Sequence, residues 1–440
     1  MPFYTPPPSR PVERALLVGV KLPGSTFREE EANIAELGLL ARTAGASISG
    51  STIQQRTRLD GSTYIGAGKL EELAGRISEG DVDLVIFDDD LSPAQARNIE
   101  KRLSVNVIDR TELILDIFAR RARTRQARIQ VEIAQLAYAL PRLRRLWEHL
   151  SRQAGGIGTR GPGETQIEVD RRRIRERIAS LKRELERIEG GARERRKNRR
   201  GLYNITIVGY TNAGKSTLLN RLAGSDVLES SRLFSTLDST TRRVELPGAG
   251  PVLFTDTIGF IRKLPAHLVS SFHATLLDVE EADLLLHVVD AAESRREDRI
   301  RIVDDVLRRI LAGGPAGARA VPDSSPRAAT LIVFNKTDLL ADEGEIPRLA
   351  ASHGGSIPVS AATGEGIDSL LDAVRERAMQ DTLTAEVAVH AGDGRTIAFI
   401  EENVAVFSRE IDGETIRYRV RLRRRDAGRL ERMAGVRVVR

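Results

Sequence analysis

The stretch Asn204 to Leu222, "NITIVGYTNAGKSTLLNRL", decides the fold of the central part of this 440-residue chain. It opens with an apolar run typical of a buried strand and closes with apolar residues at helical spacing. Between the two, Gly209 to Ser216 match G-x-x-x-x-G-K-[ST], a loop whose backbone amides surround phosphate groups at a helix N-terminus. The order predicts a nucleotide-binding α/β domain with a mainly parallel sheet, in which Lys215 neutralises phosphate charge and the Ser216 hydroxyl binds magnesium.

Three further motifs, each after an apolar run, indicate which nucleotide binds. In "VLFTDTIGF", Asp256 can reach the magnesium shell through a water molecule, and the Gly259 amide can sense the γ-phosphate. In "LIVFNKTDLL", Asp338 can accept two hydrogen bonds from adjacent N–H donors, which guanine has and adenine lacks. In "IPVSAATGEGI", the backbone of Ser360 to Ala362 can contact the guanine carbonyl oxygen. The shared order of the four motifs predicts GTP as the ligand.

The stretch "LFSTLDSTTRRVEL" lies between the first two motifs, where a nucleotide-sensing switch is expected. Thr236 is its candidate for a second magnesium ligand, beside Ser216 and a water-mediated Asp256. We assign catalytic roles to Lys215, Thr236 and Gly259. The predicted GTP-contacting residues are Gly209, Tyr210, Thr211, Asn212, Ala213, Gly214, Lys215, Ser216, Thr217, Phe234, Ser235, Thr236, Leu237, Asp238, Asp256, Thr257, Ile258, Gly259, Asn335, Lys336, Thr337, Asp338, Ser360, Ala361 and Ala362.

Two positions in these motifs bear on the rate of hydrolysis. Phe260 follows Gly259 where many GTPases carry a glutamine that orients the attacking water, so intrinsic hydrolysis is expected to be slow. Asn212 lies where some related GTPases hold a potassium ion that offsets transition-state charge. A role in stabilising the loop explains Asn212 equally well, and both interpretations stay open.

A strongly basic segment precedes this domain. Residues 119 to 200 contain 24 Lys and Arg against 10 Asp and Glu, a local balance of +14, so the remainder of the chain carries −8. Such a segment suits a partner with a phosphate backbone, although a solvated helical surface is the alternative for any charge run.

The same segment carries two apolar seams at alternating spacings of four and three, which predict an antiparallel helical hairpin of residues 112–200 with a glycine-rich tip. Pro141 should end or kink the first helix. An arm of about 25 residues would project roughly 35 to 40 Å, but a plain structural hairpin fits the pattern as well. The seam residues are Ile129, Ile133, Leu136, Leu140, Leu143 and Trp147, then Ile174, Ile178, Leu181, Leu185 and Ile188.

The two ends of the chain predict smaller domains. Residues 1–111 alternate short apolar runs such as "ALLVGV" with helical stretches such as "LSPAQARNIEKRL", which indicates a small α/β domain. In it, "YIGAGKLEEL" fails the phosphate-loop pattern twice and predicts a turn into a helix, so an RNA-remodelling ATPase there is disfavoured. After the GTPase domain of residues 201–380, residues 381–440 alternate apolar and polar residues and predict a small α+β domain with antiparallel strands and a helix.

Composition excludes several classes of protein. With 41% hydrophobic and 30% charged residues and no run of about 20 apolar residues, the chain is not expected to span a membrane. The absence of cysteine excludes disulfides and thiolate metal sites. The start "MPFYTPPPSRPVER" lacks the features of a signal peptide, so a cytoplasmic location is expected. A monomer is also expected.

The chain resembles the HflX family, within the Obg-HflX group of translation-associated GTPases. The resemblance rests on "GYTNAGKST", "FSTLDSTTR", "DTIGFIRKLP", "LSPAQARNIEKRL" and above all "GGIGTRGPGETQIEVDRR", and it extends from about Leu16 onward. It implies hydrolysis of GTP with magnesium, binding to the large ribosomal subunit and ribosomal RNA, and a role in splitting or rescuing stalled ribosomes under stress. For the C-terminal domain it implies a ribosome-facing module, although a stabilising appendage explains that domain equally well.

The resemblance also gives the glycine-rich tip a role. A basic arm with a slender tip can enter between RNA elements, where glycines let the backbone approach closely. The candidate RNA-contacting residues are Gly158, Arg160, Gly161 and Gly163. The competing hypothesis is a signalling GTPase outside the ribosome, in which GTP controls a protein partner and the arm is only a dimerisation hairpin.

Overall fold

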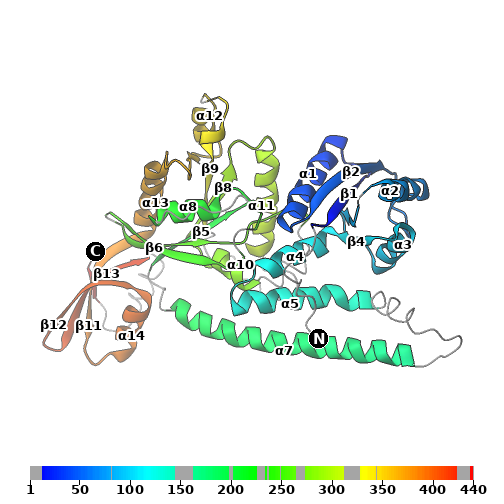
Figure 1. Cartoon of the computed structure of the whole chain (residues 1–440). Coiled ribbons are helices and arrows are strands. Elements are labelled where there is room, and N and C mark those ends of the chain that lie inside the picture. The colour runs from blue at the N-terminus through cyan, green and yellow to red at the C-terminus, as the bar shows by residue number, and fades with distance from the viewer. Residues whose placement is uncertain are drawn as a thin grey trace. The chain divides into compact units, whose positions relative to one another are not determined.

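The computed structural model (Figure 1) consists of two compact units. The first contains the described residues up to Glu184 with Leu233, Phe234 and Lys263, and the second contains the others. The described residues are 12–80, 82–143, 162–197, 202–224, 233–234, 237–247, 249–263, 273–311, 328–342, 344–423 and 437–439. No helix among them is long and apolar enough to cross a membrane.

The first unit is built on a parallel four-stranded sheet in the order β2-β1-β3-β4, which confirms the expected N-terminal α/β domain. Buried aliphatic side chains of the strands pack against α2 and α3, as expected where helices cover a parallel sheet. "YIGAGKLEEL" forms a turn into α2, with Gly66 as the N-cap residue. The elements are β1 Arg14–Lys21, α1 Phe27–Thr43, β2 Ser47–Gln55, α2 Ala67–Glu79, β3 Leu84–Phe87, α3 Pro93–Leu103, β4 Asn106–Asp109 and α4 Arg110–Arg121.

A buried ion pair joins the end of β3 to the start of α4. Arg110 donates to Asp88 Oδ1 at 2.7 Å and also to Glu36 of α1, and the side chains of Arg110 and Asp88 are 2% and 1% exposed. Lys263, which belongs to the same unit, donates to Asp88 Oδ2 at 2.6 Å. Charges removed from water this completely are costly unless each keeps its partners.

We therefore expect Arg110→Met to lower the free energy of unfolding by about 3 kcal/mol, because Asp88 stays buried after losing one of its two cations. The midpoint of urea unfolding, followed by circular dichroism, measures the change. Arg14→Met is the matched control, because the Arg14–Asp83 pair is exposed and should contribute little. Similar small shifts in both variants would contradict a stabilising role for the buried pair.

Helix α5 and the part of α7 up to Glu184, both in the first unit, run side by side (Figure 1) and form the predicted hairpin. Helix α5, Arg125–Ala139, pairs with α7, Pro162–Lys197, through Arg125–Glu184 at 2.8 Å and Arg177–Glu132 at 2.7 Å. Because the lower number on α5 pairs with the higher number on α7, the helices are antiparallel. Their buried seam includes Ile129, Ile133, Leu136, Ile174 and Leu181.

Pro141 ends the first helix as predicted, since a 3-10 turn, Leu140–Arg142, follows α5 directly. The glycine-rich tip was predicted to extend from Gly155 to Gly163, and the end of this prediction was wrong. Helix α7 begins at Pro162, where proline is favoured because its missing donor would be unpaired in any case. The RNA-contact candidate Gly163 is therefore helical, whereas Gly158, Arg160 and Gly161 lie outside the described residues, as does Trp147.

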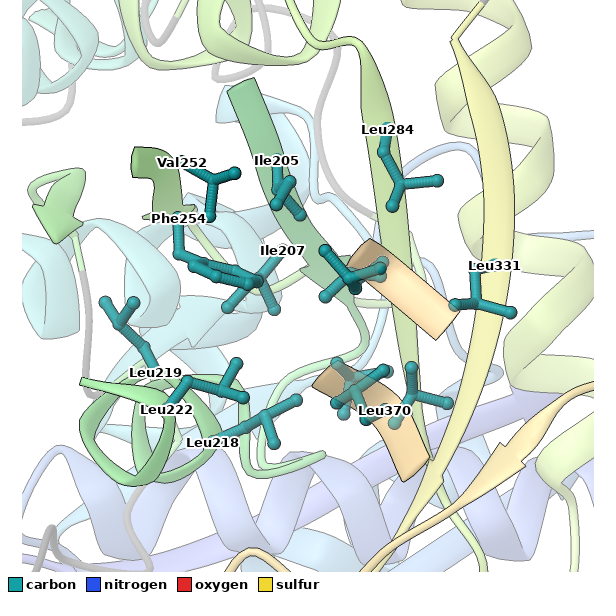
Figure 2. Close-up of a cluster of buried hydrophobic side chains, with 14 of the residues drawn as sticks. Ile205, Ile207, Leu218, Leu219, Leu222, Val252, Phe254, Leu284, Leu331 and Leu370 are labelled. Atoms are coloured by element: carbon teal, nitrogen blue, oxygen red, sulfur yellow. The ribbon is translucent and has the colours of Figure 1, made fainter. Parts of the chain in front are cut away.

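The second unit contains a six-stranded sheet in the order β10-β9-β8-β5-β7-β6, parallel except for the antiparallel edge strand β6. Figure 2 shows Ile207 of β5 and Phe254 of β7 close to Leu218 and Leu222 of α8, so the sheet fixes the helix that follows the phosphate loop. The elements are β5 Tyr203–Gly209, α8 Lys215–Leu222, β6 Thr240–Leu246, β7 Gly250–Asp256, α10 His273–Glu280, β8 Leu284–Asp290, α11 Arg296–Leu311, β9 Ala329–Asn335, η2 Thr337–Leu339, α12 Glu345–Ala351, β10 Ile357–Pro358 and α13 Ile367–Asp381.

The C-terminal part of this unit is a four-stranded antiparallel sheet in the order β12-β13-β11-β14, with one helix, as the alternating pattern predicted. Its own apolar core includes Val387, Ile400 and Tyr418. In chain order, this helix, α14, follows β11 and precedes β12. The elements are β11 Thr382–His390, α14 Gly394–Asn403, β12 Ala405–Asp412, β13 Thr415–Arg423 and β14 Arg437–Val439.

Candidate guanine nucleotide site

The phosphate loop leads from the end of β5 into α8. Gly214 has φ +88°, in the left-handed region, and a Cβ there would collide with the Asn335 side-chain amide, so only glycine fits. Lys215 opens α8, is buried, and donates through Nζ to the Tyr210 carbonyl oxygen at 2.9 Å. Burial lowers the pKa of Lys215 to about 8, against the opposing effect of Asp256. A phosphate group would stabilise this desolvated ammonium group.

Hard oxygen ligands for a divalent cation meet beside this lysine. The Ser216 hydroxyl donates to Asp256 Oδ2 at 2.6 Å, and the Asp256 side chain is almost completely buried. Among the described residues there is no group of three or more His, Cys, Asp or Glu side chains that could hold a metal. The oxygens of the Ser216–Asp256 pair fit Mg²⁺, because this ion is typically bound by one or two protein oxygens together with nucleotide phosphates and water.

The segment after β7 is held against the phosphate loop by backbone hydrogen bonds. Phe260 N–H donates to the Gly209 carbonyl at 3.1 Å, and Thr211 N–H donates to the Phe260 carbonyl at 2.8 Å. A Cβ on Gly259 would lie 2.9 Å from Lys215 Nζ, so the Gly259 backbone approaches the ammonium group closely. Lys215 and Gly259 can thus contact one phosphate group. The Phe260 side chain is buried and brings no polar group to it.

The two motifs that are predicted to contact the base are joined by side-chain hydrogen bonds. Asn335 donates through Nδ2 to the Ala213 carbonyl and accepts through Oδ1 from Ala361 N–H, both at 2.9 Å, so it ties the phosphate loop to the last motif. The Ser360 hydroxyl donates to Asp338 Oδ1 at 2.6 Å. This arrangement holds the Asp338 carboxylate and the Ser360–Ala362 backbone together.

The other predicted residues are distributed around this centre. Thr257 Oγ1 donates to the Ile207 carbonyl, Lys336 Nζ donates to Asp290, and Thr337 N–H donates to the Val359 carbonyl. Tyr210, Asn212 and Ala213 lie in the loop, Thr217 lies in α8, Ile258 follows β7, and Leu237 and Asp238 precede β6.

The switch segment is described only in part. Phe234 is buried in the first unit, where its ring packs edge-on against Phe118 at a centroid distance of 4.7 Å. Ser235 and the candidate magnesium ligand Thr236 lie outside the described residues.

Sequence reasoning missed two residues next to these motifs. Arg221 of α8 donates to carbonyl oxygens of the Ser360–Ala362 loop, and Lys263 pairs with Asp88 and Asp89 within the first unit. Both partners are far away in sequence, so no local pattern could indicate them.

A phosphate loop, a Ser–Asp pair and an Asn–Asp base motif, all at the carboxyl edge of one mainly parallel sheet, define a P-loop GTPase. Four family models match consecutive parts of the chain, "GTP-binding GTPase N-terminal" over residues 31–119, "GTP-binding GTPase Middle Region" over 121–199, "50S ribosome-binding GTPase" over 204–336 and "HflX C-terminal domain" over 345–439. The chain belongs to the HflX family of GTPases, and it is a GTP-hydrolysing enzyme.

The similarity to known proteins extends over most of the chain. GTPase HflX of Magnetococcus marinus is 43% identical over 397 residues, which cover 90% of this chain and 89% of that protein. GTPase HflX of Escherichia coli is 42% identical over 381 residues, 86% and 84% of the two chains. A solved GTP-binding protein from Sulfolobus solfataricus in complex with GDP is 23% identical over 84% of this chain and 99% of its own, with a TM-score of 0.42.

Proposed function

We propose that this GTPase acts on the large ribosomal subunit in the cytoplasm, and that it splits or rescues stalled ribosomes under stress. The match of residues 204–336 to a family model described as a 50S ribosome-binding GTPase supports this proposal. The observation that carries it is the antiparallel α5–α7 pair, whose exposed surface is rich in arginine.

The arginines of α7 suit an RNA partner. Several of them are exposed, and among the described residues Arg173 pairs with Asp170 and Arg177 pairs with Glu132. Guanidinium groups in fork geometry bind phosphate oxygens, and each neutralised phosphate releases counterions. The exposed arginines of α7 include Arg172, Arg173, Arg175, Arg177, Arg183 and Arg187.

The nucleotide site supports hydrolysis with little side-chain chemistry. Lys215 and the Gly259 amide would hold the γ-phosphate, and Ser216 with Asp256, joined by Thr236, would hold Mg²⁺. When bound, Mg²⁺ neutralises charge that develops on the phosphate oxygens. Because Phe260 cannot orient the attacking water, basal hydrolysis should be slow and the ribosome should accelerate it by ordering the switches.

A potassium ion is the further cofactor of this proposal. Asn212 lies in the phosphate loop with φ +62° and is exposed, so its side chain is accessible to a cation at the phosphates. Hydrolysis compared in potassium and sodium buffers of equal ionic strength separates this role from a purely structural one.

Co-sedimentation with ribosomal subunits tests the proposed function. The protein should pellet with large subunits in the presence of a non-hydrolysable GTP analogue and much less with GDP. Arg172→Glu/Arg173→Glu should weaken pelleting at least tenfold at low salt, since two phosphate contacts become repulsive. The matched control is Arg301→Glu/Arg308→Glu on α11, whose side chains are 73% and 71% exposed.

Two outcomes would contradict the proposal. Pelleting that does not depend on the nucleotide would separate the GTPase from ribosome binding. An equal loss in the α11 control would show that net charge alone matters, and that the α5–α7 pair is a solvated structural hairpin.

A further inference from the structure

Arg221 connects the phosphate-loop helix to the loop that faces the base. It lies on α8, six residues after Lys215, and its side chain reaches the loop after β10. Its Nε donates to the Ala361 carbonyl oxygen at 3.1 Å, and its Nη2 donates to the Ala362 carbonyl oxygen at 2.5 Å. One guanidinium group therefore fixes two consecutive carbonyls, which suits its planar fork of donors.

The orientation of these carbonyls determines where the neighbouring amides point. In a planar trans peptide, the C=O of one residue and the N–H of the next point in opposite directions. Because the Ala361 carbonyl faces Arg221, the N–H of Ala362 faces away from it. The Ala362 carbonyl also faces Arg221, so the Thr363 N–H faces away from it as well, and this N–H donates to Ser360 Oγ at 3.1 Å.

Asp338, the carboxylate proposed to read the base, lies on the side of this loop that is opposite Arg221. Ser360 Oγ, which accepts from Thr363 N–H, itself donates to Asp338 Oδ1 at 2.6 Å. The Ala361 N–H is already directed at Asn335 Oδ1 at 2.9 Å. The Ala362 N–H is thus the amide of this loop that Arg221 turns toward the region next to Asp338.

We propose that Arg221 is a positioning residue for guanine recognition, which holds the Ala361–Ala362 peptide so that the Ala362 N–H donates to the 6-oxo group of guanine. The proposal rests on Asp338 and the Ser360–Ala362 loop forming the base site. It also explains how one helix serves both ends of the nucleotide, because α8 begins at the phosphates with Lys215 and reaches the base loop through Arg221.

Three nucleotides separate recognition of the 6-oxo group from the other contacts. GDP carries all base groups, inosine diphosphate lacks the 2-amino group that Asp338 reads, and 2-aminopurine riboside diphosphate lacks the 6-oxo group and, with it, the N1–H. Dissociation constants are measured for wild type, Arg221→Ala, Arg221→Lys and the matched control Arg308→Ala, an exposed helical arginine of α11.

In Arg221→Ala, binding of GDP and of inosine diphosphate should both weaken about fivefold to tenfold, as expected for one impaired hydrogen bond. Binding of the 2-aminopurine nucleotide should change little, because it lacks the acceptor. Arg221→Lys should recover part of the loss, since one ammonium group can still donate to a carbonyl. At saturating GTP the kcat should stay unchanged while KM rises, and Arg308→Ala should match wild type throughout.

An equal loss for all three nucleotides would overturn the proposal, because Arg221 would then only support the fold. Unchanged affinities in Arg221→Ala would overturn it as well. Failure of the base-site assignment itself has a different signature, since wild type would then bind GDP and the 2-aminopurine nucleotide equally well.

Discussion

Asp338→Asn should transfer nucleotide preference from GTP to xanthosine triphosphate. Asp338 accepts from adjacent N–H groups of guanine, and an asparagine amide would instead donate to the 2-oxo group of xanthine. The Ser360 hydroxyl, which donates to Asp338 Oδ1 at 2.6 Å, would select the orientation of the new amide. With the amide oxygen held by Ser360, the NH₂ group would face the base.

The expected change is large because a bound base covers the polar group that reads it, so a mismatched base leaves that group without a partner. The ratio of GDP to xanthosine diphosphate affinity should change by about a hundredfold or more. Isothermal titration of both nucleotides against both proteins measures it. Asp342→Asn is the control, since Asp342 only caps the exposed turn before α12 through Gly344 N–H at 2.8 Å. Unchanged selectivity in Asp338→Asn would remove Asp338 from the base site.

The sequence predicted which motifs the structure brings together at one edge of the sheet, because each motif is contiguous and follows its own strand. Lys215, Asp256 and Asn335 stand at strand ends or helix starts, and parallel strands bring such ends to one edge. Because each motif follows its strand, that edge is the carboxyl edge of the sheet. Local pattern was therefore enough to predict that the phosphate loop and Asn335 lie together, although they are more than a hundred residues apart in sequence.

What the sequence could not predict depends on contacts between distant side chains and backbone. In the sequence, Arg221 looks like any other basic residue on an amphipathic helix. Its contact with the Ala361 carbonyl oxygen depends on where the fold places α8. The local sequence does not indicate that Arg110 is buried either, since its burial depends on the position of Asp88 at the end of β3. The start of α7 at Pro162 was missed because a Gly-Pro-Gly sequence fits a turn as well as a helix start.

The second large effect is expected at the tip between α5 and α7. Replacing residues 155–161 with a short unrelated turn, and keeping Pro162 and Gly163 because they belong to α7, should leave GTP binding intact. The segment lies outside all the guanine nucleotide motifs, and the hairpin keeps its Arg177–Glu132 and Arg125–Glu184 pairs. Ribosome-stimulated GTP hydrolysis and subunit dissociation should both be lost.

Arg160→Glu should be a milder form of the same defect. It exchanges an attractive phosphate contact for a repulsive one while keeping the turn, so its effect should diminish as salt screens both interactions. Arg308→Glu on α11 controls for net charge. Dissociation of subunits is measured in each variant across a salt series, alongside nucleotide affinity. Full ribosomal activity in the tip replacement would mean that the glycines only make a turn, and weakened nucleotide binding would mean that the tip supports the fold.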